Sequence, residues 1–324
     1  MTVMATTSAP PLNTAVLFLV FNRPDTTTQV FDAIRRARPQ RLYVAADGPR
    51  TDRAGEAARV ESVRKIATAV DWPCDVKTLF RDQNLGCKRA VSGAITWFFD
   101  HEEEGIILED DCLPHPDFFN FCETMLGCYR HDERVGVITG NNFQNGQQRG
   151  AASYYFSKYN HCWGWASWRR VWRHYQGDLS FWPNWKQSDE WRSHCPDKVE
   201  RRYWEKIFDQ VHAGGIDSWA YPWTACVWKQ GGLTVIPNVN LVSNIGFGEY
   251  ATHTVSLKSP IASMKTMQIG SILHNKLVEQ DKLADRYTFD FAFGGNNYRF
   301  PNLIVNISRL LVGKLWRRVK ESFL

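Results

Sequence analysis

The sequence predicts an α/β fold in which a mostly parallel central sheet is flanked by helices. The chain has 324 residues and is 44% hydrophobic, enough for a substantial core. Its first half alternates short, continuous apolar runs with longer segments of helical periodicity. This succession is typical of parallel strands joined by crossover helices, because each crossover helix covers one face of the sheet.

Five apolar runs are expected to be buried strands, because parallel strands covered on both faces contain few polar residues. They occupy residues 15–21, 42–46, 76–80, 106–108 and 135–138. Segments with helical spacing of apolar residues lie between them, at residues 26–37, 54–70, 87–99 and 118–129. The regular alternation stops in residues 154–228, which hold most of the 14 tryptophans. This region is interpreted as an aromatic-rich, acceptor-side extension of the same domain.

The domain boundaries follow from these patterns. Residues 1–13 are expected to be a flexible N-terminus, and residues 14–255 one domain with halves at 14–145 and 146–255. Residues 256–324 form a C-terminal extension, whose last part combines helically spaced apolar residues with five cations and one acid. Such a basic amphipathic helix suits an anionic membrane surface. Docking against the domain or against a homodimer partner is the alternative.

Composition argues against several classes of protein. Residues 303–324 carry a net charge of +4 out of a total of +5, so the rest of the chain is nearly neutral, unlike a nucleic-acid-binding protein. The longest apolar run is much shorter than the roughly 20 residues of a membrane span, and the first residues lack the apolar segment of a signal peptide. The eight cysteines show no CxxC pair, so neither a zinc site nor a disulfide framework is predicted. We expect a cytoplasmic protein, peripheral at the inner face of the membrane if the C-terminal helix binds lipid.

Polar segments follow four of the predicted strands. They read FNRPDT (21–26), AADGPR (45–50), FRDQNLGCKR (80–89) and LEDDCLP (108–114). In open parallel sheets ligands bind outside the carboxyl ends of the strands, so these segments are expected to converge on one crevice. No GxGxxG follows the first strand and no GxxxxGK[ST] occurs, which argues against an NAD(P) enzyme and a P-loop nucleotidase.

Three consecutive carboxylates, Glu109, Asp110 and Asp111, follow the apolar run at residues 106–108. Acids crowded at the end of a buried strand repel one another and lose hydration, so they require a cation. Hard carboxylate oxygens suit Mg²⁺ or Mn²⁺, which commonly bridge a diphosphate with only one or two protein carboxylates. A solvated acidic turn or a helix cap is the alternative interpretation.

The segment GIILEDDCLPHPDFFNFC (105–122) resembles the acidic motif of GT-A nucleotide-sugar glycosyltransferases. The likeness is strongest to the Glu-Asp-Asp segment and the following Pro-Asp-Phe-Phe of the family 13 N-acetylglucosaminyltransferases. The motifs FNRP, DGPR, NLGCKR, EDDCLP and GWASW are also similar to those of bacterial family-2-like sugar transferases. Together these resemblances cover roughly residues 14–250, and they imply a GT-A (Rossmann-like) fold, an NDP-sugar donor such as a UDP-sugar, and Mn²⁺ or Mg²⁺.

The resemblance implies a role for each acid and for the loop after the first strand. Asp111 would bind the metal, Asp110 would lie against the donor ribose or sugar, and Glu109 would support the motif. Phe21 and Arg23 lie in the loop that meets the nucleotide, and Arg23 is a candidate for the diphosphate or the base.

Further donor contacts are expected at the next strand exits. Asp47 can accept a hydrogen bond from a uracil ring N–H, and Gly48 permits close approach. A mutual or surface ion pair of Arg23 and Asp47 is the alternative. Asn84 and Lys88 lie in NLGCKRAV, which opens a helix whose N-terminal N–H groups, with Arg89, could meet phosphate oxygens. A solvated surface position is the alternative for Lys88.

The segment HCWGWASWRRVW (161–172) could provide aromatic faces around the donor sugar, because sugars stack their C–H faces on tryptophan. Gly164 and Trp165 match the family positions best, although a core role is the alternative for any single tryptophan. His253, in GEYATHT, is a candidate C-terminal metal or phosphate ligand, or else an ordinary surface histidine.

An inverting transferase needs a general base for the acceptor hydroxyl. Asp217, in GGIDSWAYPW, is similar in setting to the acid in a tryptophan-bearing segment that supplies this base in family 13. Asp189 and Glu190 in KQSDEW are its rivals, and a capping or structural aspartate is the alternative.

The predicted function is a metal-dependent hexosyltransferase or N-acetylhexosaminyltransferase. It would move a sugar from an NDP-sugar to a hydroxyl of a glycan or glycolipid, with inversion, in cell-surface polysaccharide or lipopolysaccharide synthesis. A nucleotidyltransferase acting on sugar phosphates is one alternative, but it normally carries a Gly-rich phosphate loop and VFNRPDTTTQ has no glycine. A non-catalytic carbohydrate-binding protein is another, but it would not explain the acidic strand exit.

Overall fold

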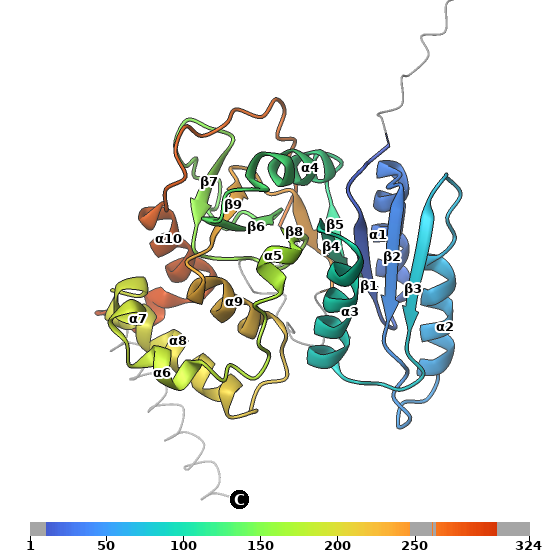
Figure 1. Cartoon of the computed structure of the whole chain (residues 1–324), viewed down its shortest axis with the longest axis horizontal. Coiled ribbons are helices and arrows are strands. Elements are labelled where there is room, and N and C mark those ends of the chain that lie inside the picture. The colour runs from blue at the N-terminus through green and yellow to red at the C-terminus, as the bar shows by residue number, and fades with distance from the viewer. Residues whose placement is uncertain (1–10, 247–260, 262–263, 303–324) are drawn as a thin grey trace, which may run out of the picture.

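The computed structural model describes residues 11–246, 261 and 264–302. A sheet with the strand order β3-β2-β1-β4-β8-β6-β9-β7 runs through the whole molecule (Figure 1). Six strands point the same way, and only β8 and β7 run antiparallel to their neighbours. The predicted α/β class, with a mostly parallel sheet flanked by helices, is confirmed.

The first half of the chain builds the β3-β2-β1-β4 side of the sheet. Its strands are β1 (Val16–Val20), β2 (Arg41–Ala46), β3 (Asp75–Phe80) and β4 (Glu104–Glu109), and its helices are α1 (Pro24–Ala37), α2 (Glu56–Ala67), α3 (Cys87–His101) and α4 (Asp117–Tyr129). Helices α1 and α2 pack side by side, and α3 covers the other face of the sheet (Figure 1). Every residue of β1 is buried, as expected for a parallel strand covered on both faces.

The second half extends the same sheet. Strand β8 (Trp165–Trp168) lies between β4 and β6 (Val135–Thr139), followed by β9 (Leu233–Pro237) and the edge strand β7 (Tyr154–Ser157). A run of helices then breaks the alternation: the short α5 (Arg169–Trp172), α6 (Trp182–Lys186) and α7 (Asp189–His194), and the longer α8 (Lys198–His212) and α9 (Ala220–Lys229). Each predicted strand and helix of the first half is present, with its ends within three residues of the prediction.

The aromatic residues of the second half form two buried groups. Trp165, Trp219 and Trp223 belong to the main core under the sheet. A second group, defined here as the tryptophan cluster, contains Trp182, Trp185, Trp191, Trp204 and Trp228 and joins α6, α7, α8 and α9. The density of tryptophan in this half therefore mainly reflects packing, since these rings are almost completely out of solvent.

A two-stranded sheet brings the chain back to the acidic motif. Strand β10 (Val242–Asn244) pairs antiparallel with β5 (Cys112–Pro114), which directly follows Asp111. The backbone N–H of Ile245 donates to the carbonyl oxygen of Asp111 at 2.8 Å. Helix α10 (Lys282–Ala292) and the 3-10 helix η1 (Gly295–Tyr298) complete the described elements. The second half of the chain is thereby held against the end of β4.

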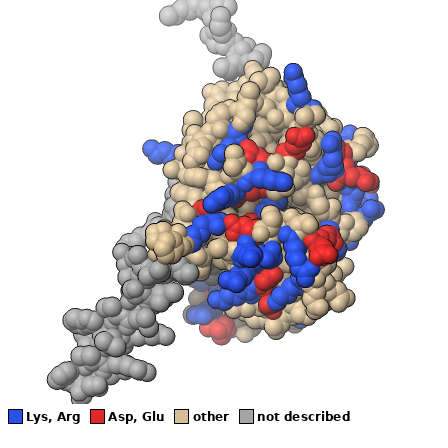
Figure 2. Space-filling model, turned by 90° about the vertical axis from the view of Figure 1, so that its left-hand side faces the viewer, with Lys and Arg blue, Asp and Glu red and all other residues tan. Residues whose placement is uncertain are grey.

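The remaining expectations concern the ends of the chain and its surface. Within the described residues, no helix has the length and apolar character needed to cross a membrane. The predicted tail helix after residue 302 and His253 lie outside the described residues. Figure 2 shows acids lying among the lysines and arginines on the face that carries α7, α8 and α10. This mixture agrees with a nearly neutral body.

Candidate functional site

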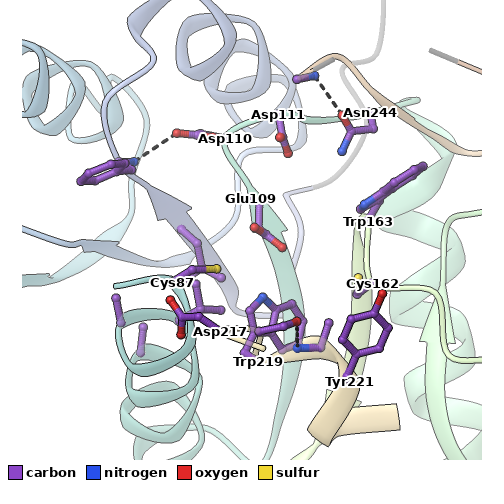
Figure 3. Close-up of a pocket in the computed structure, with 18 of the residues that line it drawn as sticks. Cys87, Glu109, Asp110, Asp111, Cys162, Trp163, Asp217, Trp219, Tyr221 and Asn244 are labelled. Atoms are coloured by element: carbon purple, nitrogen blue, oxygen red, sulfur yellow. Dashed lines mark hydrogen bonds between the residues drawn. The ribbon is translucent and has the colours of Figure 1, made fainter. Parts of the chain in front are cut away.

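A cavity of about 730 Å³ opens at the carboxyl ends of the parallel strands (Figure 3). Residues from all four predicted strand exits line it. Eight of the predicted site residues lie on its wall: Phe21, Arg23, Asp47, Asn84, Glu109, Asp110, Asp111 and Asp217. The topology therefore brings these side chains together although they are spread over almost 200 residues.

Arg23 is the cation that two of the acids face. Its Nη2 lies 2.6 Å from Oδ1 of Asp110, and its Nη1 lies 3.0 Å from Oδ2 of Asp111. The backbone N–H of Phe21 donates to the other oxygen of Asp110 at 3.1 Å. Burial raises the pKa of Asp110, and the charge of Arg23 opposes that rise. In this structure Arg23 forms an ion pair with the acidic motif, whereas the predicted alternative was a pair with Asp47.

Glu109 differs from its two neighbours. No group of the described residues donates a hydrogen bond to it, and Figure 3 shows its carboxylate pointing into the cavity. Burial raises the pKa of Glu109, and the charges of Asp111 and Asp110 raise it further. The structure thus makes Glu109 an open carboxylate of the cavity, although the sequence suggested only a supporting role for it.

A metal site can be tested against these donors. Among the described residues, no three His, Cys, Asp or Glu side chains gather as a metal site would require. Asp111 keeps 15% of its side chain exposed, against 4% for Asp110. The donors therefore fit only an ion that takes one protein carboxylate and fills its other positions with ligand oxygens and water.

Asp47 and Gly48 hold two loops together. The Asp47 carboxylate accepts hydrogen bonds from the backbone N–H groups of Gly48, Leu85 and Gly86, at 3.0 to 3.2 Å. Asn84 donates to the carbonyl oxygen of Gly48 at 2.8 Å. A Cβ on Gly48 would lie 2.4 Å from the backbone of Gln83, so the close approach that glycine permits here is that of the neighbouring loop. The oxygens of Asp47 are consequently engaged before any ligand arrives.

Besides Gly48, three predicted donor contacts do not lie on the cavity wall. Trp165 is 1% exposed and stacks on Trp219, with ring centroids 5.8 Å apart. Gly164 has φ +72° and is packed so closely that a Cβ would lie 2.7 Å from Val242. The side chain of Lys88 extends toward Gly177, since a Cβ built on Gly177 would lie 3.4 Å from the Cε of Lys88. The ligand in this cavity would meet Trp163, two residues earlier than the tryptophan predicted, because Trp165 already belongs to β8.

The three candidates for the general base separate clearly. Asp217 lines the cavity, and no hydrogen bond or ion pair engages it among the described residues. Its Oδ2 would lie 3.3 Å from a Cβ on Gly86, at the N-terminus of α3. Asp189 and Glu190 instead form ion pairs with Arg192 and Lys229, at 2.5 and 2.6 Å, away from the cavity wall. The geometry favours Asp217 over its rivals.

Two cavity arginines were missed in the sequence. Arg50 forms an ion pair with Glu56 at 2.5 Å, and its guanidinium lies over the ring of Phe21. Arg81 packs on α3, where a Cβ on Gly93 would lie 2.9 Å from its Nη2, and no acid pairs with it among the described residues. Both lie inside the polar strand exits AADGPR and FRDQNLGCKR, so position alone could have indicated them.

The opposite wall was detected only in part from the sequence: His161 and Trp163 lie in HCWGWASWRRVW and Tyr221 in GGIDSWAYPW, whereas its other residues belong to no motif. Its residues come from the loop after β6, the segment before β8 and the start of α9. We define the far wall as Asn141, Phe143, Asn160, His161, Trp163 and Tyr221. Trp163 and Tyr221 face the acidic motif across the cavity (Figure 3).

Comparison with known proteins identifies no family for the chain. No family model and no curated protein matches it. A crystal structure of HddC from Yersinia pseudotuberculosis is similar to 52% of this chain and 85% of that chain, with 13% identity and a TM-score of 0.32. A structure of UDP-glucose pyrophosphorylase complexed with UDP-glucose is similar over 45% of this chain and 62% of that chain, with 12% identity and a TM-score of 0.24. Likenesses this low carry no argument about function.

Proposed function

We propose that the chain is a glycosyltransferase that moves a sugar from a nucleotide diphosphate donor, such as a UDP-sugar, to a hydroxyl of a glycan or glycolipid. The observation that carries the proposal is the charge arrangement of the cavity. Three arginines and an acidic strand end occupy one side, and the free carboxylate of Asp217 stands near them. A donor with an anionic diphosphate and a reactive sugar needs both features.

Recognition of the diphosphate would fall first to Arg81. It forms no salt bridge among the described residues, although its charge acts on the nearby Asp47, so its guanidinium can pair with phosphate oxygens without breaking an existing ion pair. Arg50 and Arg23 already neutralise Glu56 and the two aspartates. They would contribute positive charge at the same side of the cavity while keeping the loops in place.

The chemical step would be a displacement with inversion. Asp217 would accept the proton of the acceptor hydroxyl while the hydroxyl oxygen forms a bond to the anomeric carbon. The bond from that carbon to the donor phosphate breaks, and the electron pair leaves with the nucleoside diphosphate. Mn²⁺ or Mg²⁺, if bound, would be held by Asp111 and would supply neutralisation of the leaving diphosphate.

The biological setting belongs to the same proposal. Cell-surface polysaccharide or lipopolysaccharide synthesis provides glycan acceptors at the inner face of the membrane. The basic residues between 303 and 324 would suit contact with anionic lipid there.

Replacement of Asp217 by Asn tests the proposal. We expect the transfer rate to fall by about 10²- to 10⁴-fold, the usual contribution of a general base, while the affinity for UDP stays unchanged. Transfer is measured by mass spectrometry with a panel of UDP-sugars and glycan acceptors, and UDP affinity by calorimetry with and without Mn²⁺. Asp189→Asn is the matched control. It removes an exposed acid that the sequence also offered as a candidate base, and it should keep full activity.

Two results would contradict the proposal. The first is an Asp217→Asn variant that transfers sugar as fast as the parent. The second is a parent protein that binds no nucleotide, or that makes UDP-sugar and pyrophosphate from UTP and a sugar phosphate, as a nucleotidyltransferase does.

A further inference from the structure

The cavity divides into a charged side and an uncharged side. Among the described lining residues, the only cations are Arg23, Arg50 and Arg81, and all three belong to strand exits of the first half. The far wall contributes amides, aromatic rings and one imidazole, with no arginine or lysine. Among the described lining residues, Asp217 is the charged one contributed by the second half of the chain.

Asn160 on this wall is buried without a hydrogen-bond partner. The residue is 7% exposed, and both its Oδ1 and its Nδ2 lack a partner. A buried amide in this state costs free energy, and its cost is recovered when a bound group supplies a donor and an acceptor. Such a group must both donate and accept hydrogen bonds, as a sugar hydroxyl does.

His161 adds a second unpartnered atom. Its Nε2 is buried and unpaired, and its ring lies 4.2 Å from that of Phe143 between centroids. Burial lowers the pKa of His161 to about 3, so the imidazole is neutral at physiological pH. It offers a hydrogen bond but no positive charge.

Aromatic side chains complete the wall. Trp163 and Tyr221 border the cavity beside Cys162 and opposite Glu109 (Figure 3). Aromatic rings pack well against the C–H faces of a pyranose, whereas the ring hydroxyls require polar partners at the edges. A wall of aromatic rings and neutral amides therefore matches an uncharged sugar better than a phosphate or a carboxylate.

We propose that the far wall is a subsite for an uncharged sugar ring, with Asn160 as a specificity-determining residue. The inference rests on the proposed function, because it assigns the sugar class for the same cavity. A sugar bearing a carboxylate would find no cation on this wall and would be repelled by Asp217. The ring could belong to the donor or to the acceptor, and both are uncharged hydroxyl-bearing sugars under this proposal.

The experiment compares matched neutral and acidic sugars. Calorimetry measures the affinity for UDP, UDP-glucose, UDP-galactose, UDP-N-acetylglucosamine and UDP-glucuronate. Saturation-transfer NMR measures, in the presence of UDP, the binding of methyl glycosides of the neutral sugars and of methyl glucuronide. We expect neutral sugars to bind in the calorimetric series, in the NMR series or in both. In the series where they bind, the glucuronate probe should bind at least about tenfold more weakly, which is the loss expected for one unfavourable charge contact.

Asn160→Leu tests the assigned residue. It should weaken neutral sugar binding about tenfold, leave UDP affinity unchanged, and leave the melting temperature unchanged or higher, because an unsatisfied amide is removed. Asn302→Leu, at an exposed position far along the chain, is the control and should change none of these values. If Asn160→Leu weakens the affinity for UDP-sugars, the far wall binds the sugar of the donor. If it weakens the binding of methyl glycosides, the far wall binds the sugar of the acceptor.

The outcomes separate the two proposals. If UDP does not bind, the proposed function fails. If UDP binds but the glucuronate probe binds as well as the neutral ones, or no neutral probe binds, the uncharged subsite is wrong while the nucleotide site stands. If Asn160→Leu lowers the melting temperature and leaves sugar binding intact, Asn160 has a structural role and its assignment is overturned.

Discussion

An open and a closed cluster, each joining a cation to carboxylate oxygens, differ in their surroundings. The open cluster, Arg23 with Asp110 and Asp111, lies on the cavity wall. The closed cluster joins Lys158 to Glu200 at 2.8 Å, with the hydroxyl of Tyr159 donating to the same carboxylate. Lys158 is 4% exposed and lies over the ring of Trp228 in the tryptophan cluster.

The difference teaches how one kind of interaction serves two purposes. In the closed cluster each charge is matched inside the protein and neither Lys158 nor Glu200 lines the described cavity, so the pair acts on folding and on the uniqueness of the packing. In the open cluster part of Asp111 stays accessible, and Glu109 beside it has no protein partner among the described residues. The open cluster can therefore still interact with a ligand.

The largest expected effect breaks the closed cluster. Lys158→Met should lower the free energy of unfolding by about 3–5 kcal/mol, because Glu200 then remains buried without its cation. Urea denaturation followed by tryptophan fluorescence measures the change.

Arg192→Met is the matched control for this substitution. Arg192 pairs with Asp189 on the exposed surface, where 56% and 95% of the two side chains are accessible. Such a pair contributes at most about 1 kcal/mol. If both variants lower the free energy of unfolding by the same amount, the burial of Lys158 does not strengthen its contribution to stability.

A smaller effect on stability is expected from the open cluster. Arg23→Gln should cost about 1–3 kcal/mol, because Asp110 loses a charged hydrogen bond but can take up a proton and keeps the N–H of Phe21. The same variant should bind UDP more weakly, measured by calorimetry, whereas Lys158→Met should bind it as the parent does below its melting temperature. An Arg23→Gln variant with full UDP affinity would contradict the claim that the open cluster contributes to ligand binding.

The smallest effect concerns a third pair, in which the partly exposed Arg50 meets the fully buried Glu56. Hydrogen bonds from Arg50 lower the pKa of Glu56 to about 2, although burial opposes the shift. A carboxyl whose folded pKa lies below its unfolded value stabilises the fold above about pH 4.3, and this contribution is lost as the pH falls toward 2. Because Arg50 is 42% exposed, solvent screening keeps the effect below that of the buried pair.

Urea denaturation at about pH 6 and about pH 3, on either side of the usual carboxyl pKa, measures this contribution. Glu56→Gln should lose stability at the higher pH and lose clearly less at the lower one, where part of the contribution of the ionised carboxylate is already gone. A parent-to-variant difference that is the same at both values would contradict the assigned pKa shift.

The elements of the first half could be predicted because their signals are local. A buried parallel strand needs a continuous apolar run such as residues 15–21, and a crossover helix needs its own 3.6-residue period. The convergence of the strand exits followed from topology, which a parallel sheet imposes. Trp165 could not be separated from Trp163 in this way, because the choice between core and cavity depends on where β8 enters the sheet.

The sequence by itself determined the α/β class, the elements of the first half and the chemistry available at the ends of its strands, since each depends on residues close in the chain. Only the tertiary structure decided which groups meet. Arg23 reaches Asp110 across 87 residues, and β8 inserts antiparallel beside β4. Asn160 lines the same cavity as Arg23, Arg50 and Arg81. Pairings of this kind depend on the order of strands and on packing between distant segments, which no local pattern records.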